Sequence, residues 1–219
     1  MVGYCLCALI GYLLGSIPSG FLAGKTRGID IRKTGSGNIG ATNVFRTQGM
    51  LAGILVLLAD AFKGWVAVTL AAGVICNSLY PAASPLEREW FEITAGLSAI
   101  LGHNYTCWLG FRGGKGIATS AGVLAALVPL ALIIILVIWA VVLLLTCYVS
   151  LASMIASFAL PFAAWLTGRS TNLIVVTAAM AALAIFKHKS NIQRLLNGTE
   201  NRFGRKGQPA GGHSPESTS

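Results

Sequence analysis

The stretch GSGNIGATN, residues 35–43, combines glycines with short hydrogen-bonding side chains, and Arg46 follows it closely. Glycines permit backbone conformations that turn successive N–H groups toward one point, and such nests bind anions. The arginine adds a planar fork of donors that fits phosphate oxygens. A flexible linker could have the same composition, but it would not need to lead directly into a helix start. We therefore expect a phosphate site here. The residues assigned to it are Gly35, Ser36, Gly37, Asn38, Gly40, Thr42, Asn43 and Arg46.

A second glycine-rich segment, residues 102–116, again places bare backbone beside a cation. Its end resembles a Walker A loop only in part, because Leu109 stands where that motif requires glycine and Gly116 where it requires Ser or Thr. The pattern therefore favours phosphate binding over ATP binding. His103, at the start of the segment, is expected to be structural. The residues assigned to this second phosphate site are Gly113, Gly114, Lys115 and Gly116.

The third polar segment, KHKSNIQRLLNGTE, follows the last apolar stretch. His188 and Asn191 are three residues apart and would share one face of a helix. Because the histidine lies among cations at the edge of an apolar stretch, we expect it to take part in chemistry. We expect Glu200 to be structural, through a pair with Arg194 or Arg202.

The elements that position these segments must be those of a membrane protein. Of the 219 residues, 55% are hydrophobic and 11% are charged, and the mean hydropathy is +0.72, whereas a soluble domain carries roughly 25% charged residues. Apolar stretches cover residues 2–24, 51–75 and most of 117–186. Each exceeds the ~20 residues that cross a bilayer as a helix. We expect an all-α, polytopic transmembrane bundle.

The distribution of charge predicts which side of the membrane each loop occupies. Basic residues concentrate in residues 25–50, 105–116 and 187–206, whereas residues 76–92 carry three glutamates and one arginine. Cytoplasmic loops are enriched in Lys and Arg, so the three basic segments mark the cytoplasmic face. The net charge of +9 therefore reflects topology, and we expect no nucleic acid partner.

Segments on the same side of a membrane must be separated by an even number of spans. Two spans fit between the first two basic segments. Residues 117–186 hold two or four, and four fit better, because two would each be far longer than a bilayer about 30 Å thick requires. Breaks between these four are expected at Pro129, Pro161 and residues 167–171. This gives seven spans, with five as the alternative, an N-terminus outside and a C-terminus in the cytoplasm.

The domain organisation that follows is simple. Residues 1–204 form one integral membrane domain, and residues 205–219, rich in Gly, Pro and Ser, are expected to form a disordered cytoplasmic tail. Two pairs of small residues, each at four-residue spacing on the first span, predict close helix packing. These residues are Gly11, Gly15, Gly20 and Gly24.

Asp60 and Lys63 form a charged pair within an apolar stretch, three residues apart and on one helical face. Charges inside a membrane frequently mark a functional site. They can equally neutralise each other and position the second span. The sequence leaves both interpretations open.

The segments GSIPSGFLAG, DIRKTGSGNIGATNVFR, GHNYTCWLGFRGGKGIAT and HKSNIQRLLNGTE resemble, in order and spacing, the signature motifs of the bacterial acyl-phosphate:glycerol-3-phosphate acyltransferases. The resemblance runs from the first span to about residue 204. It implies a multi-pass inner-membrane enzyme of phospholipid synthesis with a cytoplasmic active site. The implied substrates are acyl phosphate and glycerol 3-phosphate, which agrees with two phosphate sites, and the products are lysophosphatidic acid and phosphate.

The resemblance also implies roles for individual residues. It assigns the first loop and the glycine–lysine loop to phosphate binding and the third segment to the same centre. It further implies the lipid bilayer as surroundings and a functional link to the enzyme that makes acyl phosphate. No cofactor and no metal are expected. The residues expected to act directly in catalysis are Ser36, Arg46, Lys115, His188 and Asn191.

The expected chemistry needs no protein nucleophile, because an acyl phosphate is a mixed anhydride with phosphate as a ready leaving group. The sequence contains no GxSxG elbow and no evident Cys–His pairing. We expect direct attack by the substrate hydroxyl, with either His188 or the substrate's own phosphate as the base.

Two functions of other classes remain to be tested. A transporter of phosphorylated metabolites would also use glycine-interrupted helices at an anion site, although its site would lie near the midplane of the membrane. A non-catalytic adaptor could bind anionic lipid through basic loops, but this would leave the glycine loops and His188 without a role.

Overall fold

The computed structural model describes residues 1–204, and this part of the chain is helical without strands. The predicted tail, residues 205–219, lies outside the described residues. The helices are α1 (Val2–Ser16), α2 (Ser19–Lys25), η1 (Ile31–Lys33), α3 (Ala41–Gln48), α4 (Met50–Val66), η2 (Ala67–Ala72), α5 (Gly73–Leu79), α6 (Pro85–Asn104), η3 (Cys107–Leu109), α7 (Ile117–Leu127), α8 (Pro129–Thr146), α9 (Val149–Leu166), α10 (Thr171–Lys187) and α11 (Lys189–Leu196).

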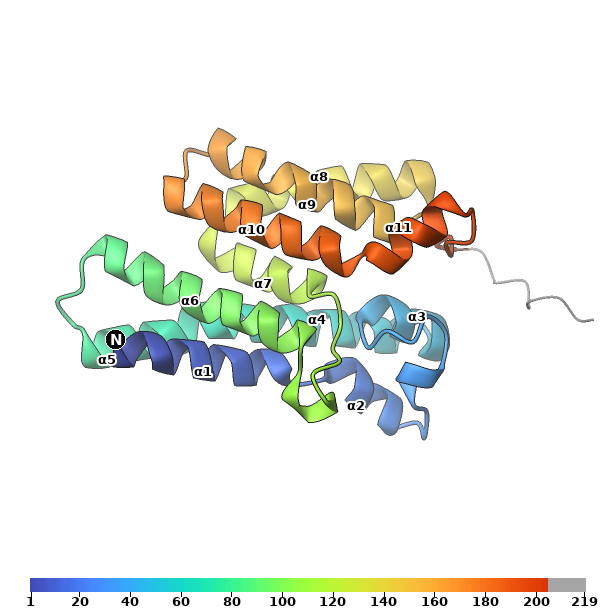
Figure 1. The fold of residues 1–219 in the computed structure, drawn as a ribbon, viewed down its shortest axis with the longest axis horizontal. Helices are drawn as coiled ribbons and strands as arrows, with labels where there is room; N and C mark the ends of the chain where they lie inside the picture. The colour runs from blue at the N-terminus through green and yellow to red at the C-terminus, as the bar shows by residue number, and fades with distance from the viewer. Residues whose placement is uncertain (205–219) are drawn as a thin grey trace, which may run out of the picture.

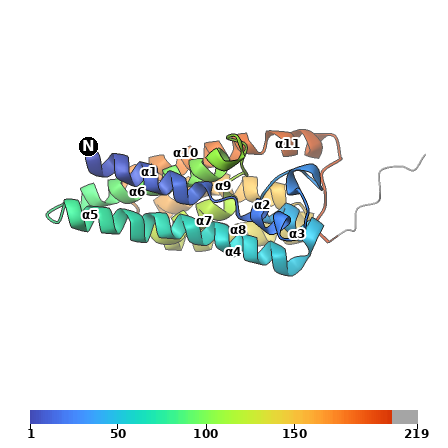
Figure 2. The same cartoon turned by 90° about the horizontal axis from the view of Figure 1, so that it is seen from below.

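The long helices run side by side along the long axis of the molecule (Figure 1). Helix α1 packs on α6, α4 on α7, and α9 lies between α8 and α10. The short helices α2, α3 and α11 gather at one end of the bundle, and the N-terminus lies at the other, as both side views show (Figures 1 and 2). The three polar segments of the sequence therefore meet at the end that holds these short helices.

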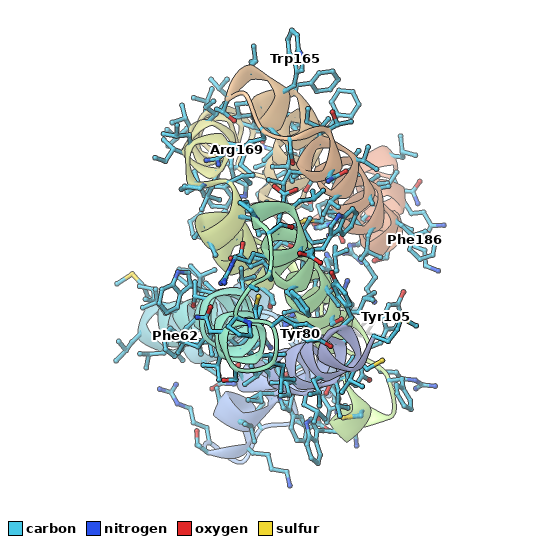
Figure 3. All side chains as sticks on the ribbon, turned by 90° about the vertical axis from the view of Figure 1, so that its left-hand side faces the viewer. Phe62, Tyr80, Tyr105, Trp165, Arg169 and Phe186 are labelled. Carbon is cyan, nitrogen blue, oxygen red and sulfur yellow. The ribbon has the colours of Figure 1, made fainter. Side chains whose placement is uncertain are left out.

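The outer surface of the bundle is apolar, as a membrane requires. Seen end-on, Phe62, Trp165 and Phe186 point away from the bundle (Figure 3), and they are 63%, 66% and 58% exposed. Within the described residues, four helical segments are long and apolar enough to cross a membrane. They are Val2–Lys25, Met50–Leu79, Pro129–Thr146 and Val149–Leu166, and the bent pair α10–α11 adds a fifth if it forms one span.

Helix length and composition identify four or five membrane spans in the described residues, so they do not confirm the predicted seven. Of the remaining long-axis helices, α6 carries charges in its first turns, and α7 has only 11 residues. Both nevertheless lie alongside the other long helices (Figure 1). The expected division of residues 117–186 into four helices, α7 to α10, is confirmed.

The break points inside that region were predicted in part. Pro129 begins α8, and residues 167–170 separate α9 from α10, as expected. The break expected at Pro161 is wrong, because this proline lies inside α9. The chain breaks instead at Cys147, in a left-handed conformation with φ of 59°, where its carbonyl accepts a 2.6 Å hydrogen bond from the N–H of Phe203.

Close helix contact explains the glycine spacing of the first span. Gly15 lies against the carbonyl of Ala99 on α6 so closely that a Cβ there would overlap the oxygen, and Gly11 meets Ala95 in the same way. Small residues let helix backbones approach where apolar lipid supplies no hydrophobic drive for association. The predicted helix packing is thus confirmed for Gly11 and Gly15, whereas Gly20 and Gly24 lie against the carbonyls of Ile39 and Ile29, which are outside the helices.

Candidate active site

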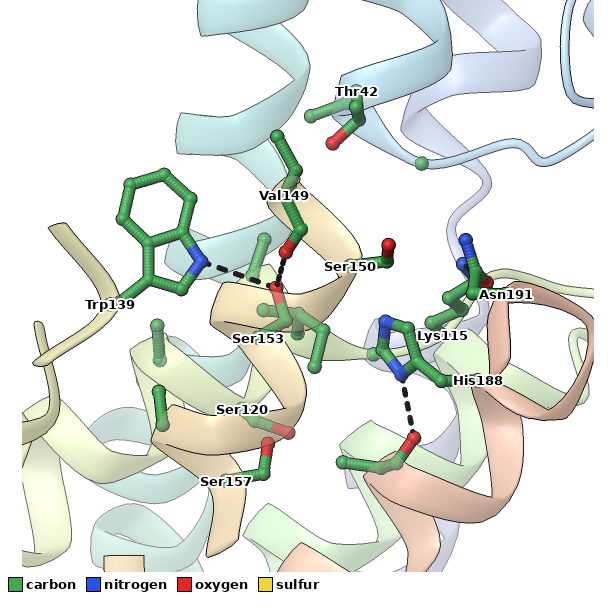
Figure 4. A pocket seen from close by; sticks show the side chains of 18 of the residues that line it. Thr42, Lys115, Ser120, Trp139, Val149, Ser150, Ser153, Ser157, His188 and Asn191 are labelled. Atoms are coloured by element: carbon green, nitrogen blue, oxygen red, sulfur yellow. Dashed lines mark hydrogen bonds between the residues drawn. The ribbon is translucent and has the colours of Figure 1, made fainter. Parts of the chain in front are cut away.

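A cavity of about 350 Å³ lies among α3, α7, α8, α9, α10 and α11 (Figure 4). One end is polar and carries charges, and the other is apolar. Most of the predicted site residues line it, from all three polar segments. They are Ser36, Asn38, Gly40, Thr42, Asn43, Arg46, Lys115, Gly116, His188 and Asn191.

The other predicted glycines shape the loops and do not line the cavity. Gly35 and Gly37 have φ of 60° and 70°, a left-handed conformation that favours glycine. Gly113 and Gly114 donate their N–H groups to the carbonyls of Asn104 and His103, at 3.2 and 3.0 Å.

Asn43 is a buried support of the first loop. Its amide nitrogen lies 3.1 Å from the carbonyls of Ile31 and Thr34 and 2.8 Å from that of Asn38. Its amide oxygen accepts the N–H of Ser36 at 2.8 Å. Because these bonds occupy the amide, Asn43 holds the loop in shape rather than offering a free donor to a ligand.

Three N–H groups of the predicted anion-binding loop are used inside the loop itself. The N–H of Gly37 donates to the carbonyl of Thr34 at 3.1 Å, and that of Gly40 donates to Asn38 Oδ1 at 2.8 Å. With the N–H of Ser36 also occupied, these donors are bonded within the loop. The first loop therefore offers a ligand its hydroxyl groups, the guanidinium of Arg46 and the N–H groups of Ala41 and Thr42 in the first turn of α3.

Cations from three segments surround the polar end of the cavity. The Lys115 ammonium donates to Asn191 Oδ1, and Arg46 and Arg194 line the same space. Burial lowers the pKa of Lys115 to about 8; Glu200 opposes this shift, and the two arginines add to it. Such a cluster favours a phosphate dianion, because hydrogen bonds between ionised partners are the strong ones.

Glu200 belongs to this centre, although the sequence suggested only a structural pair. Its Oε2 accepts Arg194 Nε at 2.7 Å, so the expected pairing with Arg194 is confirmed. Its Oε1 accepts the Ser150 hydroxyl at 2.8 Å and Asn191 Nδ2 at 2.7 Å. Glu200 and Ser150 line the cavity, and the pairing of an acid with a serine 50 residues away left no signal in the sequence.

His188 is 2% exposed and has a defined tautomer. Its Nδ1 lies 2.7 Å from the carbonyl oxygen of Ala184, one turn earlier on α10. A carbonyl can only accept, so Nδ1 carries the proton in the neutral ring. The other ring nitrogen points into the cavity, toward the side where Ser150 lies (Figure 4). His188 is therefore arranged to accept a proton there.

The apolar end of the cavity runs between α8, α9 and α10. Leu132, Trp139 and Met180 are among its lining residues. Trp139 Nε1 donates to Ser153 Oγ at 3.2 Å, and Ser153 donates to the Val149 carbonyl at 2.8 Å, which satisfies the polar atoms at this wall (Figure 4). The space suits a hydrocarbon chain attached to an anionic head.

Comparison with known proteins agrees with this chemistry. A family model described as glycerol-3-phosphate acyltransferase matches residues 5–198. A glycerol-3-phosphate acyltransferase of Geotalea daltonii is 46% identical over 194 residues, which is 89% of this chain and 94% of that protein. The enzyme of that name from Geobacter sulfurreducens is 42% identical, over 93% of this chain and 99% of its own.

Solved structures match as well. The glycerol 3-phosphate form of PlsY (YgiH), described as an integral membrane glycerol 3-phosphate acyltransferase, is 37% identical with a TM-score of 0.81, over 92% of this chain and 96% of that chain. The lysophosphatidic acid form of PlsY is 36% identical with a TM-score of 0.79, over 92% and 95%. Since the family model and the similar relatives each cover most of its length, this chain belongs to the glycerol-3-phosphate acyltransferase family.

Proposed function

We propose that this protein transfers a fatty acyl group from acyl phosphate to the 1-hydroxyl of glycerol 3-phosphate, giving lysophosphatidic acid and inorganic phosphate. The observation that carries the proposal is the cavity itself, in which a cation-lined end is continuous with an apolar channel. An acyl phosphate has this shape, with a hydrocarbon chain and an anionic head. The names of the relatives support glycerol 3-phosphate as the acceptor.

The choice of acyl phosphate as the acyl donor is supported by the absence of an activated nucleophile among the described residues of the cavity. No cysteine lines it, and no hydrogen bond joins one of its serine hydroxyls to His188: Ser150 donates to Glu200 and Ser153 donates to the Val149 carbonyl. An enzyme that acts through an acyl-enzyme needs an activated nucleophile with a base beside it. A mixed anhydride needs neither, because its carbonyl carbon is already activated. Direct transfer from acyl phosphate is therefore favoured over transfer through the protein.

The proposed reaction is a single displacement. The 1-hydroxyl oxygen of glycerol 3-phosphate bonds to the carbonyl carbon, the bond from that carbon to the phosphate oxygen breaks, and phosphate leaves with the electron pair. The hydroxyl proton passes to the free ring nitrogen of His188 or to the phosphate of the substrate. Arg46 and Lys115 hold the negative charge. Orienting two bound reactants can lower a barrier by about 7 to 11 kcal/mol, so no covalent intermediate is needed.

We further propose seven spans, with the N-terminus outside and the active site at the cytoplasmic face of the bacterial inner membrane. The support is the position of α6 and α7 alongside the long apolar helices, with the basic segments at the end opposite the N-terminus (Figures 1 and 2). A site at that end could receive acyl phosphate from the enzyme that makes it. It also disfavours transport, which requires access from both sides.

The test is a comparison of donors with the purified protein in lipid nanodiscs. Palmitoyl phosphate with glycerol 3-phosphate should yield lysophosphatidic acid and an equal amount of phosphate, whereas palmitoyl-coenzyme A should yield neither. Equal or greater activity with the thioester would overturn the proposed donor. Flux of glycerol 3-phosphate into proteoliposomes without any acyl transfer would instead establish the transporter.

A further inference from the structure

Asp60, Lys63 and His103 form a buried polar cluster that the mechanism above does not use. Asp60 Oδ1 lies 2.8 Å from Lys63 Nζ and 3.5 Å from His103 Nδ1. The three residues are 1%, 6% and 5% exposed. Burying an ion carries a penalty of several kcal/mol, so a charged pair kept inside an apolar bundle calls for a role.

One contact of the cluster joins two helices. Lys63 Nζ donates to the carbonyl of Ile17 at 2.8 Å, where α1 ends before Pro18. This bond satisfies a carbonyl left free at a helix end. It explains the position of Lys63, but it does not explain why Asp60 also faces His103.

The other side of the cluster meets the glycine loop. The carbonyl of His103 accepts the N–H of Gly114 at 3.0 Å. The Nε2 edge of the imidazole faces Gly114, so that a Cβ at residue 114 would overlap Nε2 and come within 3.0 Å of Cδ2. The next residue is Lys115, whose ammonium reaches the cavity and bonds Asn191. A change in the orientation of the imidazole would thus move the backbone that carries the lysine.

We propose that Asp60 and Lys63 are positioning residues that act through His103. They fix the orientation of its imidazole, and the imidazole sets the backbone of Gly114 so that Lys115 reaches the substrate phosphate. The effect on turnover rests on the proposed function, because it assumes that Lys115 binds a phosphate of the reactants. Asp60 and His103 also line the cavity that Lys115 reaches.

The central variant is Asp60→Asn combined with Lys63→Gln, which removes both charges and avoids leaving one buried ion unpaired. We expect kcat/KM for glycerol 3-phosphate to fall by about 10- to 100-fold, as small displacements of positioning groups do. The same pair of substitutions, made in a Lys115→Ala protein, should have little further effect, because no ammonium remains to be placed. Contacting or coupled sites show this departure from additivity.

The proposal would be overturned if the effects of the paired substitutions and of Lys115→Ala on kcat/KM were additive. If the paired substitutions reduce kcat/KM by the same factor in both backgrounds, the cluster supports the fold in general and does not act through Lys115. Wild-type kcat/KM in a variant with wild-type thermal unfolding would overturn it as well.

A second variant keeps the test decisive should the paired substitutions prevent folding. Gly114→Ala introduces a methyl group against the imidazole and should reduce kcat/KM in the same Lys115-dependent way. Gly73→Ala is the matched control, because no atom lies within 4 Å of a Cβ there. A Gly114→Ala protein with the kinetics of the control would refute the link through the imidazole.

A binding measurement separates this proposal from the proposed donor. Stabilisation by glycerol 3-phosphate in thermal unfolding needs no acyl donor. It should be smaller in the Asp60→Asn/Lys63→Gln protein than in the wild type. If palmitoyl phosphate fails as a donor while this difference holds, the donor is wrong and the positioning role stands. Equal stabilisation in the two proteins would contradict the positioning role whatever the donor.

Discussion

The charge of Lys115 depends on its burial. Burial lowers its pKa to about 8, so the free protein loses this positive charge as the pH rises through that value. The pH dependence of kcat/KM reports groups of the free enzyme. We expect kcat/KM for glycerol 3-phosphate to fall above about pH 8. In a Lys115→Arg protein the fall should move well above pH 8, because a guanidinium keeps its proton there. An unchanged alkaline limb would show that another group causes it.

Asn43 is predicted to matter through the shape of its loop. Asn43→Ala would remove the bonds to the surrounding carbonyls and leave buried acceptors unpaired, at a cost of about 1–3 kcal/mol. We expect a lower thermal unfolding temperature together with a higher KM for glycerol 3-phosphate. Asn197→Ala, at an exposed position after α11, is the control and should change neither. A raised KM with normal stability would mean that Asn43 contacts the ligand directly.

At this scale the sequence predicted the residue types of the site better than their roles. Ser36, Arg46, Lys115 and His188 reach one cavity as expected. Three N–H groups expected to face a ligand instead bond oxygens of the loop itself, two of them the amide oxygens of Asn38 and Asn43. Which donors a loop uses internally depends on its folded conformation, and residue types alone do not determine that.

Helix breaks show how far an element can be predicted. Pro129 and the stretch after α9 broke the chain as expected, since both disfavour continued helix locally. Pro161 did not, and α9 continues across it, as membrane helices tolerate. The break at Cys147 depends partly on a hydrogen bond from Phe203. A contact between residues so far apart in the chain leaves no local signal.

The contact between α1 and α6 gives a prediction at the scale of elements. A Gly15→Ala methyl group would overlap the Ala99 carbonyl and push the helices apart. Overpacking of this kind typically costs about 1–3 kcal/mol. We expect a lower unfolding temperature than in the wild type, measured in the same detergent. Gly73→Ala, which has open space, should unfold like the wild type, and equal unfolding of the two variants would contradict the assigned packing.

Most of the cations in residues 1–204 lie at one end of the molecule, with Arg88 and Arg169 among the exceptions, and the apolar surface runs along its length. The sequence predicted this arrangement from charge and hydropathy alone. It could not predict the apolar end of the cavity, which side chains from three helices enclose only after packing. It paired Glu200 with Arg194 but missed the contact with Ser150, which lies 50 residues away in the chain.

The arrangement of seven spans can be tested at Cys147. With seven spans, the turn between α8 and α9 lies in the cytoplasm, whereas two long spans across residues 117–186 would place it outside. A protein that retains only Cys147 should react with a membrane-impermeant maleimide from the cytoplasmic side alone. Ala82→Cys, in the exposed turn before α6, should react only from outside. Labelling of Cys147 from outside would support five spans.

The central claim is that the bound alcohol displaces phosphate directly, and intact-mass measurement of the protein during a single turnover tests it most directly. The protein is mixed with palmitoyl phosphate and glycerol 3-phosphate and quenched at intervals as lysophosphatidic acid forms. The account predicts only the mass of the unmodified chain at every interval. A palmitoyl adduct of the protein that appears and decays at the rate of product formation would contradict it.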